Sequence, residues 1–353
     1  MNEGRRLVAL RAGAVRCRLR RPYQLSFGRL DHFLAHWFVA RDAEGRLGVG
    51  EVVALPGYGH ETADSVAATL ARFAAENRGA AHAVAVARAR SLIATSPFAA
   101  SAILTALQLP AWLDEVPAPA AVNVAVTPDA EAQPDEARRL RAAGFRFLKV
   151  KIGRGFDADA ALARRLLDAE ALDVRLAFDA NQGFALDEAL RFAEVLADDP
   201  HRRVQWFEQP IDRADWAGLA TLCAKAPVPI VLDESIDDAA DAARAANIGA
   251  AGVKLKLCKH GGPDELAALL AALPVELQVI VGNGVATDVA NAVELLVRAR
   301  SGRCVAPAEC CGFARLVEPL AFAGLTVDDG QARLTGDLRD ALEGAVARWE
   351  ARS

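Results

Sequence analysis

The chain has 353 residues, of which 53% are hydrophobic, and a formal net charge of −5. This length allows one large domain and a smaller one, each with its own core. The small acidic excess argues against nucleic acid or an anionic membrane as a partner. No apolar run reaches the roughly 18 residues that would predict a membrane span.

The six cysteines lack the spacing of a disulfide framework, and the N-terminus does not lead into an apolar signal segment. We therefore expect reduced thiols and a cytoplasmic protein. Cys310 and Cys311 are adjacent, and neighbouring residues of a strand point to opposite faces, which favours two inert thiols over a metal or redox pair.

The first third of the chain changes from strand to helix patterning. Residues 6–53 contain β-forming runs at 7–10 and 33–39, with turn residues at 42–45. Residues 62–114 are rich in alanine and leucine and predict helices. This order predicts a small α+β domain.

From about residue 120, apolar strand patterns alternate with alanine-rich helical patterns such as 157–171 and 187–197. The strand starts lie 23 to 30 residues apart, and eight such βα units predict a (β/α)8 TIM barrel. A doubly wound open sheet is the competing fold, but no G-x-G-x-x-G follows the first strand. The predicted strands are Val122–Val126, Phe147–Ile152, Val174–Phe178, Val204–Glu208, Ile230–Asp233, Val253–Leu257, Leu277–Val281 and Cys304–Ala308.

These patterns define two predicted domains. Residues 1–117 form an α+β capping domain, and residues 118–319 form the barrel. Residues 320–334 read as turn-rich strand, and we expect the segment 320–353 to return and complete the capping domain. The fold class is therefore α/β, a modified TIM barrel with an N-terminal α+β cap.

Three acidic residues, Asp179, Glu208 and Asp233, close the third, fourth and fifth predicted strands. Adjacent strands lie about 4.8 Å apart, so these carboxylates can converge on one ion. Three oxygen donors without cysteine or histidine favour a hard cation, Mg²⁺ or in its place Mn²⁺. A single strand-end acid is usually a helix cap or a surface group, but three in register are not.

Two lysine pairs stand on opposite strands of the predicted barrel. Lys149 and Lys151 share one face of the second strand, and Lys254 and Lys256 share one face of the sixth. Lysine is costly to bury, so four lysines in apolar runs need a chemical reason. A neighbouring ammonium and a divalent cation would lower the pKa of one lysine in each pair and make it a usable base.

These motifs together resemble the enolase superfamily, and within it the muconate lactonizing enzyme subgroup. The likeness extends over nearly the whole chain and includes two stretches, 48–51 and 58–62, that look like the capping-domain loop of that family. The barrel segments that carry it are Leu148–Gly153, Phe178–Gly183, Phe207–Pro210, Asp233–Ser235 and Leu255–Gly262.

The resemblance implies that a base removes the proton α to a substrate carboxylate while Mg²⁺ stabilises the enediolate. It implies three metal ligands, Asp179, Glu208 and Asp233. It also implies an acid/base pair, for which Lys256 fits the motif before Gly261-Gly262 better than Lys254 does. The remaining implied roles are Lys151 as the other base, Lys149 on the substrate carboxylate, and Asn181 and Glu234 around the site. Asn283 follows the seventh predicted strand, so we expect it at the same end of the barrel.

Two bases permit racemisation or epimerisation, which we favour, on a small N-substituted amino or imino acid. Cycloisomerisation of the muconate type and syn-dehydration are the alternatives, and a non-catalytic metal-binding barrel is an alternative of another class. Dipeptide epimerases of the subgroup carry Asp-x-Asp after the eighth strand, whereas this chain has Glu309-Cys310-Cys311. Glu309 looks like the lactonizing enzymes, or it simply pairs with a lysine.

The predicted partner is a small-molecule carboxylate. The stretch 22–29 has the character of a closing loop, from which Arg29 could meet a second carboxylate of the substrate. We also expect a homo-oligomer.

Overall fold

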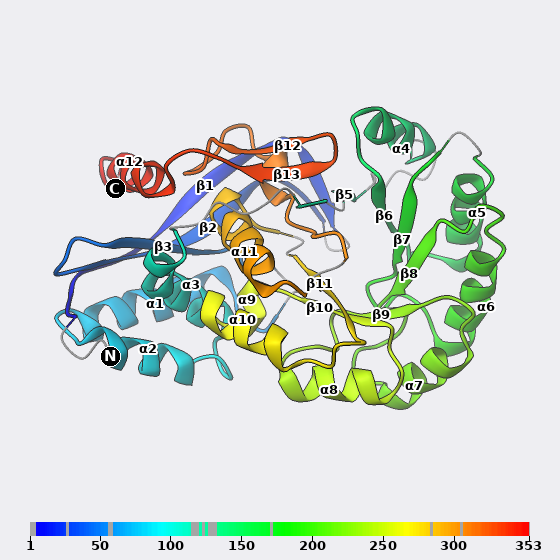
Figure 1. Cartoon of the computed structure of the whole chain (residues 1–353), viewed down its shortest axis with the longest axis horizontal. Coiled ribbons are helices and arrows are strands. Elements are labelled where there is room, and N and C mark those ends of the chain that lie inside the picture. The colour runs from blue at the N-terminus through cyan, green and yellow to red at the C-terminus, as the bar shows by residue number, and fades with distance from the viewer. Residues whose placement is uncertain are drawn as a thin grey trace.

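The computed structural model of the chain describes residues 5–25, 28–55, 59–113, 120–121, 124–125, 133–169, 172–282, 285–303 and 306–352. Figure 1 shows two regions side by side, with the N-terminal strands and helices at one end and the parallel strands with their outer helices at the other. Within the described residues, no helix is both long and apolar enough to cross a membrane.

The N-terminal region is an antiparallel sheet covered by helices. The sheet has the order β1-β2-β3, and glycine at positions 48 and 50 lets β3 approach the backbone of α3. This confirms the predicted change from strand to helix. The elements are β1 (Leu7–Leu25), β2 (Gly28–Asp42), β3 (Leu47–Val52), α1 (Ala63–Asn77), α2 (His82–Ser91), α3 (Pro97–Gln108) and the 3-10 turn η1 (Leu109–Ala111).

In the segment 22–29, for which we predicted the character of a closing loop, the described residues 22–25 and 28–29 belong to a β-hairpin. Residues 22–25 continue β1, and β2 begins at Gly28, with Gln24 paired to Arg29 across the hairpin. Backbone pairing of β1 with β2 thus resumes beyond an irregularity between Arg18 and Tyr23 and extends further than the glycine suggested.

The barrel region contains a seven-stranded parallel sheet in the order β11-β10-β9-β8-β7-β6-β5, so each strand lies beside its neighbour in sequence. This is the order that repeated βα units produce. The strands are β5 (Val124–Ala125), β6 (Phe147–Lys151), β7 (Arg175–Asp179), β8 (Val204–Glu208), β9 (Ile230–Leu232), β10 (Gly252–Leu255) and β11 (Gln278–Val281).

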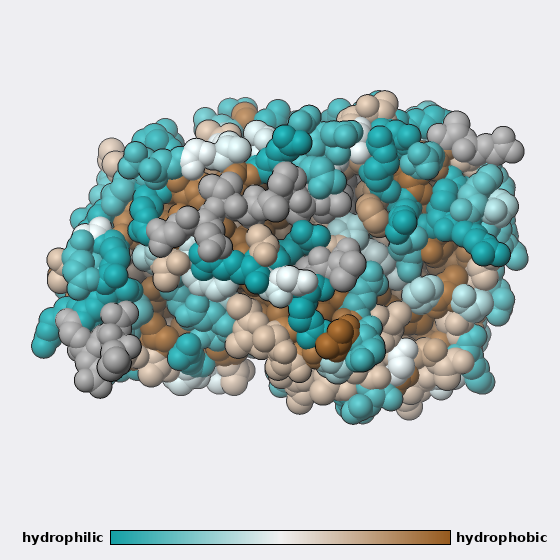
Figure 2. Space-filling view, viewed as in Figure 1, coloured by the Kyte–Doolittle hydropathy of each residue, from teal (hydrophilic) through white to brown (hydrophobic). Residues whose placement is uncertain are grey.

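Helices follow these strands: those after β5 to β9 form the outer layer at the right and bottom of Figure 1, whereas those after β10 and β11 lie nearer the N-terminal region. Most of their charged residues are exposed or half-buried, although Asp159, Asp288 and Glu294 are buried. Figure 2 shows a largely hydrophilic outer edge, with hydrophobic residues visible in the recesses. The helices are α4 (Gln133–Ala142), α5 (Phe156–Leu167), α6 (Leu186–Ala197), α7 (Trp216–Lys225), α8 (Ala239–Asn247), α9 (Leu257–His260), α10 (Pro263–Ala272) and α11 (Asp288–Ser301).

The eighth predicted strand is much shorter in the described residues than its sequence suggested. It joins the sheet through one parallel bridge, between Gly282 and Glu309. A Cβ atom at Gly282 would lie 2.5 Å from the Cβ of Glu309, so glycine is needed for this approach. The bridge nevertheless brings Glu309 beside the end of β11.

The C-terminal segment returns to the N-terminal region, as the labels of α12 and β1 in Figure 1 show. The ring of Trp349 lies tilted against that of Trp37 with their centroids 6.0 Å apart, and Glu343 pairs with Arg41 at 2.7 Å. These contacts support the two-domain division, whose boundaries stay a prediction. The segment contains the 3-10 turn η2 (Gly312–Arg315), β12 (Leu325–Asp328), β13 (Gln331–Leu334) and α12 (Leu338–Glu350), with β13 also paired to β4 (Ala120–Ala121).

Candidate active site

Asp179 and Glu208 are the last residues of β7 and β8, and Asp233 directly follows β9. Asp179 and Glu208 are paired across the two strands, and all three carboxylates are almost completely buried. The structure therefore places the three acids on neighbouring strand ends, where we predicted them. Their role as metal ligands stays a prediction.

A small cluster of buried, largely apolar residues includes one side chain from each of the three strands that carry the acids. Since residues i and i+2 share a strand face, each of its members on β7, β8 and β9 precedes one of the three acids by two residues. The indole of Trp206 donates a hydrogen bond to Glu208 Oε2 at 3.3 Å. The cluster comprises Ala177, Trp206, Val231, Ile280 and Ala306.

Two buried ammoniums lie among the carboxylates. Lys149 Nζ is 2.7 Å from Asp179 Oδ2 and 2.7 Å from Glu208 Oε1. Lys254 Nζ is 3.0 Å from Glu208 Oε1 and 3.4 Å from Asp233 Oδ2. Each lysine therefore bridges two of the three acids.

Glu309 completes this cluster from the eighth segment. Its carboxylate accepts hydrogen bonds from Lys149 at 2.9 Å and from Lys254 at 2.5 Å. The structure shows the pairing of Glu309 with lysine that was one of our two interpretations, and the likeness of Glu309 to the lactonizing enzymes stays a prediction. With 6% of its surface exposed and both oxygens engaged, it offers little to the charged amine of a substrate.

The other two lysines stand at the two ends of the acidic row. Lys151 Nζ lies 2.5 Å from Asp179 Oδ2, and Lys256 Nζ lies 2.8 Å from Asp233 Oδ1. The Lys151 side chain keeps 30% of its surface exposed, whereas Lys256 keeps 7%. The pair thus flanks the carboxylates from β6 on one side and from the end of β10 on the other.

Asn181 and Glu234 connect these ends. Asn181 accepts a hydrogen bond from Lys151 at 2.8 Å and donates one to Glu234 at 2.9 Å. Asn181 has a φ of 42°, a left-handed conformation that asparagine tolerates better than most residues. The loop after β7 therefore orients Lys151 through its amide.

The carboxylates and lysines shift one another's pKa values. Burial and the adjacent Asp179 raise the pKa of Glu208 to about 7. Burial alone would lower the pKa of Lys149 and Lys254, but the adjacent carboxylates outweigh it and raise both. Burial opposes the charge of Asp179 as well, but the surrounding lysines hold its pKa far below the ordinary value.

The pKa of Lys256 is set by neighbours of both signs, and the predicted lowering by an ammonium and a divalent cation together stays a prediction. Burial and Lys254 act in that direction, but Asp233 and Glu234 raise the pKa of Lys256 overall. We predicted Asp233 only as a metal ligand, whereas in the structure it also contacts the amine of Lys256 directly.

The structure does not bring every predicted residue to this cluster. Arg29 lies exposed in the β1–β2 hairpin, and no described contact joins it to the lysines or acids. Asn283 lies outside the described residues, so its predicted role is untested.

Sequence reasoning also missed Gln209, which is fully buried beside the acids. Its side-chain oxygen accepts hydrogen bonds from the backbone N–H groups of Asp233 at 3.0 Å and Ser235 at 3.1 Å. Gln209 has a φ of 34°, an unfavourable conformation for glutamine that its surroundings must stabilise. The signal was present in the Glu208-Gln209-Pro210 motif, which we used only for the resemblance.

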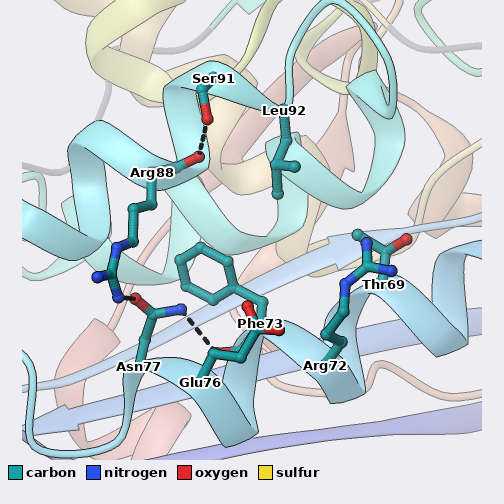
Figure 3. Close-up of a pocket in the computed structure, with 8 residues that line it drawn as sticks. All are labelled: Thr69, Arg72, Phe73, Glu76, Asn77, Arg88, Ser91 and Leu92. Atoms are coloured by element: carbon teal, nitrogen blue, oxygen red, sulfur yellow. Dashed lines mark hydrogen bonds between the residues drawn. The ribbon is translucent and has the colours of Figure 1, made fainter.

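Another polar pocket lies between α1 and α2, in the N-terminal region (Figure 3). Its groups are largely paired with one another, since Arg88 donates to Asn77 at 2.8 Å and Ser91 donates to the Arg88 carbonyl at 2.8 Å. None of its lining residues belongs to the lysine–carboxylate cluster. They are Thr69, Arg72, Phe73, Glu76, Asn77, Arg88, Ser91 and Leu92.

The model of the enolase C-terminal domain-like proteins matches residues 133–337, more than half of the chain. The chain belongs to this family. The predicted resemblance to the enolase superfamily is thereby confirmed, and the matched residues include all four site lysines and all four buried carboxylates.

Similar proteins are isomerases by name. A hydrophobic dipeptide epimerase from Enterococcus faecalis is 36% identical over 123 residues, which are 35% of this chain and 34% of that relative. The match therefore spans about a third of the relative's length.

Similar structures span almost the whole chain. A muconate lactonizing enzyme from Pseudomonas fluorescens, complexed with muconolactone, has a TM-score of 0.84, is 24% identical, and covers 96% of this chain and 98% of its own. A dipeptide epimerase from Enterococcus faecalis, complexed with Mg and the dipeptide L-Leu-L-Tyr, has a TM-score of 0.83 and is 21% identical. The match covers 94% of this chain and 97% of the epimerase chain. At these identities the likeness establishes the fold, a barrel with a capping domain.

Proposed function

We propose that this protein is a metal-dependent isomerase that moves the proton α to a substrate carboxylate. The observation that carries the proposal is the position of Lys151 and Lys256, one at each end of a buried row of three carboxylates. A substrate bound over this row would have an amine on either side of its α-carbon, which a two-base exchange of that proton requires.

The donor set suits a hard divalent cation such as Mg²⁺. Asp179, Glu208 and Asp233 offer only carboxylate oxygens, from adjacent strand ends, and these are the ligands that Mg²⁺ prefers. When bound, the cation stabilises negative charge that develops on the substrate carboxylate. The Mg in the similar dipeptide epimerase structure supports the same choice of metal.

The chain's own residues supply the proton transfer. One flanking lysine, as the neutral amine, accepts the α-proton on its Nζ, and the other, as the ammonium, returns a proton to the opposite face of the same carbon. Asn181 orients Lys151 through its side-chain oxygen, and Asp233 contacts Lys256. Burial of the row excludes water from the carbon while it carries negative charge.

The favoured substrate is an N-acylated or otherwise N-substituted amino acid. The dipeptide epimerases among the similar proteins support an amino acid whose nitrogen carries an acyl group. Glu309 is occupied by Lys149 and Lys254, so it does not provide a counter-ion for the free ammonium of a dipeptide. We therefore favour an uncharged N-acyl group over a dipeptide.

Cycloisomerisation is the second candidate. A lone Glu309 in place of Asp-x-Asp and the similar muconate lactonizing enzyme structure favour it. Syn-dehydration uses the same first step. The oligomeric state and a cytoplasmic location also stay predictions.

The test is proton exchange in D₂O with a library of N-acyl amino acids, dipeptides and unsaturated dicarboxylates, with Mg²⁺ and with excess EDTA. We expect incorporation of one deuterium at the α-carbon, inversion of configuration and no other mass change. Ring closure without racemisation would favour the cycloisomerase, and loss of water the dehydratase. Equal turnover in EDTA by metal-free protein would contradict the metal-dependent mechanism.

A further inference from the structure

Lys254 is a buried lysine in direct contact with two of the proposed metal ligands. It is 2% exposed, and its Nζ contacts Glu208 Oε1 and Asp233 Oδ2, which belong to two of the three proposed metal ligands. In the described part of the chain, no three Asp, Glu, His or Cys side chains are grouped so that they could hold a metal as they stand. Ammoniums contact one oxygen each of Asp179 and Glu208 and both oxygens of Asp233.

Lysines and carboxylates of the cluster offset much of one another's charge. Four lysines are in direct contact with four carboxylates, the three proposed ligands and Glu309. A divalent cation would add two positive charges beside these lysines. Repulsion between like charges is strong away from water, so a bound metal favours withdrawal of an ammonium that shares its ligand oxygens.

The distances identify which ammonium can withdraw. Lys254 is 3.0 Å from Glu208 and 3.4 Å from Asp233 but only 2.5 Å from Glu309. It can therefore leave both proposed ligands and still keep its closest partner. Lys149 is held by both Asp179 and Glu208 at 2.7 Å, closer than it is to Glu309 at 2.9 Å.

We infer that Lys254 is a built-in competitor of the metal, which occupies Glu208 and Asp233 in the cation-free protein and withdraws onto Glu309 when the metal binds. This inference rests on the proposed function, because it takes the three acids as the metal ligands. Glu309 then acts as the acceptor for the displaced lysine. The buried carboxylates remain neutralised whether or not a cation is present.

The experiment measures Mn²⁺ and Mg²⁺ binding to the whole protein by calorimetry, without substrate, for wild type and Lys254→Met. Methionine has a similar length and no charge, so Glu208 and Asp233 each lose one ammonium and keep their contacts with Lys149 and Lys256. We expect metal affinity to rise by about 10-fold or more, since coupling between sites is typically 5–150-fold. We also expect a lower Tm without metal and a larger rise in Tm on adding it.

Lys259→Met is the matched control. Lys259 is also buried, but its Nζ pairs with Asp237 at 3.2 Å and with no proposed ligand in the described contacts. Its loss should leave metal affinity within about twofold of wild type. Lys254→Gln, which keeps an N–H donor toward Glu309, replaces the methionine variant if that variant does not fold, and it should also bind metal more tightly.

The outcomes separate this inference from the proposed function. Unchanged or weaker binding by both Lys254 variants, with clear binding by wild type, overturns the inference and leaves the metal proposal standing. An equal gain in Lys259→Met shows a general effect of charge and also overturns it. If neither wild type nor the Lys254 variants bind metal, the metal proposal fails and the inference fails with it.

Discussion

At the residue scale, four lysines can enter the barrel because each ammonium faces a carboxylate. The expense of burying an ion is offset only when its partners are close and well oriented. Lys149 contacts three acids within 2.9 Å, and Trp206 donates to the remaining oxygen of Glu208. Glu208 is thus the residue on which both interior lysines depend.

Replacing Glu208 with glutamine should destabilise the protein by about 3 kcal/mol, because Lys149 and Lys254 lose a shared counter-ion in a buried site. Urea unfolding measures the change. Glu194→Gln, an exposed position on α6, is the control and should stay within about 0.5 kcal/mol of wild type. A loss for Glu208→Gln no larger than that of the control would contradict the ion network described here.

Much of this cluster could be predicted at the residue scale. The i, i+2 rule placed Lys149 with Lys151 and Lys254 with Lys256, and equivalent strand ends brought the three acids together. The contacts of Lys254 could not be predicted, because they depend on how far a flexible side chain reaches across the barrel. The raised pKa of Lys256 followed from such a contact, with Asp233.

At the element scale, the loops that follow β7 and β8 hold the site through unusual backbone conformations. Asn181, Gln182 and Gln209 all have positive φ values. Gln209 uses its amide to fix the backbone of the next loop, at Asp233 and Ser235. The backbone that carries the Asp233 carboxylate, after β9, is therefore fixed by Gln209, which follows the neighbouring strand β8.

Gln209→Ala should lower metal affinity by about 10-fold, because groups that orient a ligand typically contribute 10–100-fold. It should also lower stability by about 1–3 kcal/mol, since two buried N–H groups lose their acceptor. Calorimetry with Mn²⁺ and urea unfolding give the two values. Gln205→Ala, on the same strand but half-buried, should change neither, and an equal effect of both variants would argue against the orienting role.

Element boundaries show what a sequence pattern can and cannot predict. Seven parallel strands lie close to their predicted ranges, because a buried strand is a distinct apolar run. The eighth is reduced to the Gly282–Glu309 bridge in the described residues, and residues 22–25 and 28–29 belong to a hairpin. Both depend on pairing with distant residues, which periodicity along the chain does not encode.

At the scale of the whole molecule, a buried carboxylate joins the N-terminal sheet to the barrel. Glu51 of β3 accepts hydrogen bonds from the backbone N–H of Thr287 at 2.7 Å and from its hydroxyl. Thr287 is the N-cap of α11, so Glu51 lies at the positive end of that helix. Burial nevertheless raises the pKa of Glu51 to about 8.

This pKa predicts a pH dependence of stability. In the unfolded chain Glu51 ionises near its ordinary pKa of 4.5, whereas in the folded protein it keeps its proton up to about pH 8. The folded state therefore binds more protons in this window, and its free energy of unfolding falls as the pH rises from 4.5 to 8.

Glu51→Gln removes this contribution, so the stability of the variant relative to wild type should increase between pH 5 and pH 8. Urea unfolding of both proteins at several pH values measures the difference between their free energies of unfolding. The contributions of other titrating groups are the same in both proteins and largely cancel in this difference. Glu76→Gln, an exposed position on α1, should give no such trend. A difference that is constant with pH would show that Glu51 is already ionised in the folded protein.

The central claim is that two lysines serve opposite faces of one carbon, and the most direct measurement is α-proton exchange in D₂O for each enantiomer of a substrate that racemises. Lys151→Ala and Lys256→Ala should both stop racemisation, while each still exchanges the enantiomer served by the remaining lysine. Lys225→Ala, on the exposed face of α7, should behave as wild type. Racemisation that survives in Lys256→Ala but is abolished in Lys254→Ala would contradict this assignment.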